Sequence, residues 1–72
     1  MPAASREIGT LTKRELEVVQ LLAHGYEPSQ IAARLGVTRN QIQGLIYGAR
    51  KHLMADTTPH IVYLALKKGL IH

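Results

Sequence analysis

Residues 30–42 constrain the fold of this chain more than any other stretch, because they combine the features of two short helices joined by a tight turn. Gly36 stands where the chain must leave the first helix, and glycine adopts the positive φ of such an exit at the lowest cost. Thr38 then supplies a side-chain oxygen that can cap a second helix, and Gln41 follows three residues later to bond back. Ala32 is small where the second helix must approach the first closely. The apolar positions expected at the helix crossing are Ile31, Leu35, Val37 and Ile42.

This pattern is typical of a helix-turn-helix, a motif that places its second helix in the major groove of DNA. The combined requirement for an alanine, a glycine and four apolar positions makes the pattern specific. A plain helical hairpin without a ligand would nevertheless give the same pattern in some proteins, because short motifs have false positives. On the motif alone, both interpretations are open.

The chain of 72 residues is long enough for one small domain. We expect a flexible N-terminal arm over residues 1–10 and a helix-turn-helix domain over residues 11–72. The sequence has no cysteine, which excludes a disulfide framework and a zinc–thiolate site. No apolar run approaches the roughly 20 residues of a membrane span, and the N-terminus lacks a signal-peptide core. We therefore expect no membrane partner and a cytoplasmic location, associated with the nucleoid when the chain is bound to DNA.

Charge is unevenly distributed along the chain, whose net charge is +4. Between Pro28 and Ala55 the sequence holds no acidic residue. The basic residues of that stretch are Arg34, Arg39, Arg50 and Lys51. A basic, acid-free half suits a polyanionic partner, although an ordinary solvated surface would also explain so few charges.

The first two helices are predicted from their end signals. The first follows a capping box of Thr12 and Glu15 and ends at Gly25. We expect Glu15 to face water or the edge of the core. The apolar side of this helix consists of Leu16, Val18, Val19, Leu21, Leu22 and Ala23. The second helix begins with Pro28, whose missing N–H is harmless at a first helical position, and runs to about Leu35.

The third predicted helix, about residues 39–54, has two distinct faces at about 100° per residue. Its apolar stripe consists of Ile42, Ile46, Ala49 and Leu53, with Leu45 at the edge. The opposite face holds Asn40, Gly44, Tyr47 and Lys51, flanked by Gln43 and Gly48. Side-chain amides suit adenine edges, arginine suits guanine, and cations suit phosphates.

Two glycines on one helical face need an explanation, because each costs about 1 kcal/mol relative to alanine. Either the backbone at Gly44 and Gly48 closely approaches DNA or another protein, or the helix is held from its core side and tolerates both. The sequence leaves these two explanations open.

A fourth helix is predicted to begin at Pro59, after a cap at Thr58, and to end at Gly69. The apolar run over residues 61–66 would also suit a buried strand, but these end signals favour a helix. We expect Ile61, Val62 and Ala65 to face the core, and Leu70 and Ile71 to fold back onto it. The other side should pair with a second copy of the chain, or else stay partly exposed. The residues expected in this dimer interface are His60, Tyr63, Leu64 and Lys67.

No constellation of residues indicates catalysis or metal binding. The four histidines are not paired at ligand spacing on one helix face, and no cysteine or acidic cluster joins them. We expect all four histidines on the surface. The sequence also lacks a nucleophile with a neighbouring base and a glycine-rich phosphate loop. We therefore expect no enzyme activity, no metal, no cofactor and no small-molecule ligand.

Most of the chain, about residues 11–71, resembles the LuxR-type, GerE-like DNA-binding domain. The likeness lies in Leu-Thr-Lys-Arg-Glu-Leu-Glu-Val-Val over residues 11–19, Ile-Ala-Ala-Arg-Leu-Gly-Val-Thr over residues 31–38, and Gly-Leu-Ile over residues 69–71. The resemblance implies four helices, a third helix that reads the major groove, a fourth helix used for dimerisation, and transcriptional control. With no receiver or ligand-binding domain in the sequence, the chain is similar to free-standing members.

The sequence departs from the family pattern at several positions. Gln43 stands where the family usually has a lysine, and Leu45 where a histidine is common. The second helix opens with Glu27 and Pro28, where small polar residues and often a lysine are usual. A phosphate would be repelled by Glu27 and would receive no N–H from Pro28. These departures affect the DNA-binding surface rather than the fold.

The preferred hypothesis is a sequence-specific transcriptional regulator that binds double-stranded DNA as a homodimer. The residues expected at DNA are Lys13, Arg14, Thr38, Arg39, Asn40, Gln43, Gly44, Tyr47, Arg50 and Lys51. Among them, Arg39, Asn40, Gln43 and Tyr47 are expected to face bases, and Lys13, Arg50 and Lys51 to hold phosphates. The alternative is a protein-interaction module that binds RNA polymerase or another regulator through Gly44, Tyr47 and Gly48.

Overall fold

The computed structural model describes residues 11–72, so the expected arm over residues 1–10 lies outside the described residues. The helices are α2 (Lys13–Ala23), α3 (Pro28–Leu35), α4 (Arg39–Leu53) and α5 (Thr58–Lys67). Residues 11–72 contain no strand, and the expected all-α fold is confirmed. None of the helices described here is long and apolar enough to cross a membrane.

Side chains fix where the helices begin. Thr12 Oγ1 accepts a hydrogen bond from the Glu15 N–H (3.2 Å), and Glu15 Oε1 accepts one from the Thr12 N–H (3.0 Å). The same reciprocal pair joins Thr38 and Gln41 at the start of α4, with distances of 3.1 and 2.8 Å. Both predicted capping boxes are confirmed, and each satisfies two N–H groups that a helix start leaves unpaired.

The prediction that Thr58 caps the last helix is wrong by one residue. Thr57 is the cap, and its side chain accepts from the N–H of His60 at 3.2 Å. Pro59 therefore stands at the second helical position, where its missing N–H is as harmless as at the first, because the first four helical N–H groups have no partner within the helix.

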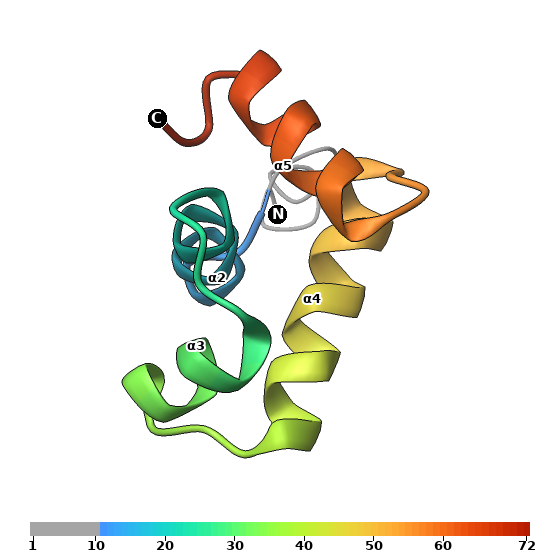
Figure 1. Cartoon of the computed structure of the whole chain (residues 1–72). Helices are drawn as coiled ribbons and strands as arrows, with labels where there is room; N and C mark the ends of the chain where they lie inside the picture. Colours follow the sequence, from blue (N-terminus) through green and yellow to red (C-terminus); the bar gives the residue numbers. More distant parts are fainter. Residues whose placement is uncertain (1–10) are drawn as a thin grey trace.

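Helices α2 and α4 form the centre of the described fold, since they contact each other and each also contacts both α3 and α5. Figure 1 shows α3 beside the beginning of α4 and α5 across its end, with α2 between them. The buried core of the described residues consists of Val18, Val19, Ile31, Ala32, Ile42, Ile46, Ala49, Leu53, Ala55, Ile61, Ala65 and Ile71. The predicted stripe of α4 is therefore confirmed, and its burial holds the opposite face of the helix outward.

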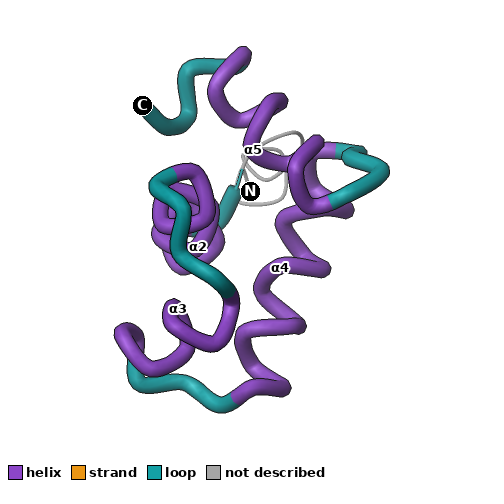
Figure 2. The backbone as a smooth tube through the Cα atoms, viewed as in Figure 1, coloured by secondary structure: helices purple, strands orange, loops and turns teal. Residues whose placement is uncertain are grey.

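The turn between α3 and α4, which is drawn as a loop in Figure 2, has the predicted left-handed glycine. Gly36 has φ 70° and ψ 32°, in the left-handed region that glycine adopts most easily. The N–H of Val37 then donates to the carbonyl of Ala32 at 3.0 Å, which closes the end of α3. Ala32 is buried, and its side chain is only a methyl group. Helix α4 can therefore cross α3 closely.

Glu15 is buried, so the prediction that it faces water or the edge of the core is wrong. Only 6% of the residue is exposed, and its Oε1 lies 2.8 Å from Nδ1 of His52 on α4. A carboxylate only accepts hydrogen bonds, so His52 donates here. This contact leaves His52 half-buried, and His60 is half-buried as well, so the prediction that all four histidines are surface residues is wrong for these two.

Gly48 faces this buried carboxylate. A Cβ built at Gly48 would overlap Oε2 of Glu15. The glycine therefore makes room for Glu15 between α2 and α4, and neither explanation suggested by the sequence applies to it. Gly48 is half-buried, so it contributes less than Gly44 and Tyr47 to the surface proposed for the protein-interaction alternative. At Gly44, by contrast, an added Cβ would meet nothing within 4 Å.

Helix α5 is confirmed, with Ile61 and Ala65 in the core. Leu64 does not point away from the core as predicted, because it is half-buried and packs against the core cluster. Tyr63 and Leu66 are the exposed apolar residues of this helix, at 57% and 50% exposure. On a helix of about 100° per residue, position 63 lies opposite the buried pair, and position 66, one turn later, lies on the same outward side. After α5, Ile71 is buried, so the predicted return of the chain onto the core is confirmed.

Candidate nucleic-acid interface

The outer face of α4, which we define as Asn40, Gly44, Tyr47 and Lys51, is exposed along its whole length. Tyr47 alone leaves 56% of its surface accessible. The face opposite is anchored by four buried apolar residues, so these side chains are presented on a rigid helix. This arrangement offers an amide, a bare backbone patch, a phenol and a cation to a ligand that lies along α4.

Two cations lie near the ring of Tyr47. The guanidinium carbon of Arg50 is 5.3 Å from the ring centroid, and Lys51 Nζ is 5.8 Å from it. Both distances are within the range of cation–π attraction, which steadies the ring on the surface. Arg50 is also half-buried, and its Nη1 donates to the Ala55 carbonyl at 3.3 Å. Arg50 therefore helps to close the end of α4, a role that the sequence analysis does not predict.

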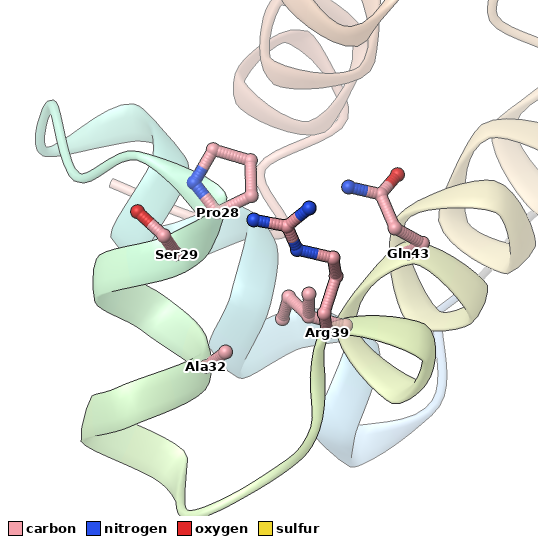
Figure 3. A pocket seen from close by; sticks show the side chains of 6 residues that line it. Pro28, Ser29, Ala32, Arg39 and Gln43 are labelled. Atoms are coloured by element: carbon pink, nitrogen blue, oxygen red, sulfur yellow. The ribbon is translucent and has the colours of Figure 1, made fainter.

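Arg39 and Gln43 lie on the flank of α4 that faces α3. Together with Ala32 and Ile42, and with Pro28 and Ser29 at the start of α3, they line a hollow of about 370 Å³. In Figure 3 the guanidinium of Arg39 extends toward Pro28, and the amide of Gln43 lies at the opposite side of the hollow. Thr38, at the cap of α4, is exposed next to this group, and its oxygen accepts from the Gln41 N–H.

Lys13 and Arg14 form a separate group on α2. Arg14 Nη1 lies 3.0 Å from Glu17 Oε1, and both side chains are about half exposed. A second hollow, of about 260 Å³, is lined by Lys13, Arg14 and Glu17. The acidic neighbour offsets part of the positive charge, so Lys13 is the stronger of the two for an anionic ligand.

The part of the chain that the structure describes has no group of three histidine or acidic side chains that could hold a metal ion. The expected absence of a metal and a cofactor stays a prediction.

The fold and this surface define a class of protein. A glycine turn between two packed helices, followed by a capped helix with an exposed polar face, is a DNA-binding helix-turn-helix domain. The family model described as "Bacterial regulatory proteins, luxR family" (GerE) matches residues 9–63. The chain therefore belongs to the LuxR family of bacterial regulatory proteins, and it is a DNA-binding regulator domain of that family.

The relatives are longer proteins. The chain is 36% identical over 61 residues to the oxygen regulatory protein NreC of Staphylococcus carnosus (strain TM300), a match that covers 85% of this chain and 28% of NreC. A VqmA–ligand–DNA complex from Vibrio cholerae superimposes with a TM-score of 0.78 at 33% identity, over 85% of this chain and 27% of VqmA. A VqmA dimer without target DNA gives a TM-score of 0.82 at 30% identity, over 94% and 32% of the two chains. The chain thus spans between about a quarter and a third of the relatives' length.

Proposed function

We propose that this chain binds specific double-stranded DNA sequences through α4 in the major groove and thereby regulates transcription. The observation that carries the proposal is the exposed outer face of α4, which stands on a helix held by a buried stripe on its other side. A major groove about 12 Å wide admits such a helix. The VqmA relative crystallised with DNA supports the choice of partner.

The roles of individual residues follow from their places. Asn40 and Tyr47 are exposed on the outer face and meet base edges, and Gly44 between them lets the helix backbone come close to the bases. Lys51 and Lys13 are exposed cations that bind phosphates. The hydroxyl of Thr38 keeps its hydrogen for a phosphate oxygen, because its oxygen acts as the acceptor in the cap. Arg14 and Arg50 contribute less, since Glu17 and the Ala55 carbonyl engage them.

A homodimer through α5 is the second part of the proposal. Tyr63 and Leu66 expose apolar surface side by side on this helix. The ring of His60 stacks on Tyr63 with centroids 6.2 Å apart, and Lys67 Nζ lies 5.9 Å from the Tyr63 ring. Apolar surface rimmed by polar groups suits a two-fold contact, and two copies would read two half-sites. The VqmA dimer supports this arrangement. Leu66 replaces Leu64 as the central leucine of the contact.

The salt dependence of DNA binding tests the proposal. Fragments selected from a random pool are titrated with the full chain between about 50 and 200 mM salt. Each phosphate contact contributes about −0.9 to the slope of log K against log salt, so several contacts give a steep slope. Absence of binding at the lowest salt, or a slope near zero, would contradict the proposal.

A further inference from the structure

The hollow between α3 and α4 contains a cation, Arg39, and the direction of this side chain does not suit base reading. Arg39 is the first residue of α4, and residues at the start of a reading helix ordinarily contact base edges. Arginine at such a place is commonly paired with guanine. In this chain, however, the Arg39 side chain lines the flank toward α3 together with Ser29 and Gln43, and Figure 3 shows its guanidinium extending toward Pro28. The outer face of α4 begins with Asn40 instead.

The hollow lies where a DNA backbone has to pass. In a helix-turn-helix the first helix crosses the backbone while the second enters the groove, so a space between the start of α3 and the start of α4 faces phosphates. Among the described residues that line the hollow, Arg39 carries the charge, and Ser29 and Gln43 are neutral hydrogen-bond donors. All three side-chain types commonly contact phosphate oxygens.

The start of α3 offers less to a phosphate than an ordinary helix N-terminus does. Pro28 has no N–H, and the N–H of Glu27 already donates to Gln30 Oε1 at 2.8 Å. The carboxylate of Glu27 also adds a negative charge at this end of the helix. Arg39, which lines the same hollow as Pro28, supplies a cation that compensates for the missing donor and for the added charge.

We propose that Arg39 binds a DNA phosphate in this hollow, with Ser29 and Gln43 as neutral donors beside it, and does not read a base. This inference rests on the proposed function. It moves Arg39 and Gln43 from the bases to the backbone and leaves base reading in the first two turns of α4 to uncharged residues. Asn40 is the amide of the outer face, and an amide pairs with adenine. The operator half-site therefore carries an A·T pair opposite Asn40 and no guanine selected by Arg39.

The test compares R39Q with K68Q, since each removes one positive charge from an exposed side chain and Lys68 lies outside the proposed interface. The full chain first selects its operator from random DNA. Affinity for that operator and for a scrambled duplex of equal composition is then measured across salt concentrations, with N40A as the base-reading reference. Circular dichroism confirms that each variant is folded.

The proposal predicts that R39Q weakens binding to both duplexes equally, on the order of tenfold at 0.1 M salt, and reduces the steepness of the salt slope by about 0.9. N40A should lower the operator-to-scrambled ratio by about 5- to 100-fold, and K68Q should change neither quantity. A loss of the operator-to-scrambled ratio in R39Q would overturn the proposal, and so would an unchanged slope. Failure of the unmodified chain to bind any duplex would refute the proposed function itself.

Discussion

Two glycines of α4, four residues apart on one helix, should respond in opposite ways to the same substitution. Gly44→Ala adds a methyl group where nothing lies within 4 Å. Its main effect is the gain in helix propensity, so the free energy of unfolding should rise by up to about 1 kcal/mol. For a domain of this size, that corresponds to an increase in Tm of about 4–8 °C.

Gly48→Ala has the same propensity gain but must displace the carboxylate of Glu15. That carboxylate accepts from the Thr12 N–H at 3.0 Å and from His52 at 2.8 Å, and Glu15 is 6% exposed. Loss of one hydrogen bond to a buried charged group costs about 1.5–3 kcal/mol. The propensity gain is common to both variants, so Gly48→Ala should be less stable than Gly44→Ala by about that amount and less stable than the parent chain.

Urea unfolding followed by circular dichroism measures both variants under one set of conditions. The Glu15→Ala background provides the control, because removal of the carboxylate should turn Gly48→Ala into a stabilising change like Gly44→Ala. Equal stabilisation by the two alanines in the parent chain would refute the assignment of Gly48 to the contact between α2 and α4.

Two further predictions concern the end of α4 and the exposed side of α5. Met54 closes α4 with φ 59° and is 85% exposed, so Met54→Gly should raise the free energy of unfolding by about 1 kcal/mol, because a side chain in the left-handed region is strained. A lower Tm for Met54→Gly would contradict this. Tyr63→Ala should shift the chain toward the monomer in analytical ultracentrifugation and leave the α-helical content unchanged, since Tyr63 is half exposed and outside the core. Lys68→Ala is the matched control on the same end of the molecule, and an unchanged dimer fraction in Tyr63→Ala would count against a contact through α5.

Most of the features predicted correctly from the sequence are set by residues close together in the chain. The caps at Thr12 and Thr38 join residues three apart, and the left-handed turn at Gly36 depends on one residue. The buried stripe of α4 follows from helical periodicity alone. Because each of these depends on local geometry, the sequence alone was sufficient to predict the all-α fold and the exposed outer face of α4.

Tertiary structure decided what several polar side chains do. Glu15 and His52 are 37 residues apart, and only the packing of α2 on α4 brings the imidazole to the buried carboxylate. The same packing explains why position 48 is a glycine, because a Cβ there would overlap the carboxylate. Likewise, the direction of Arg39 depends on where α3 lies beside α4. A long polar side chain takes its role from its partners in space, which periodicity does not reveal, whereas the burial of an apolar stripe is set by the helix that carries it.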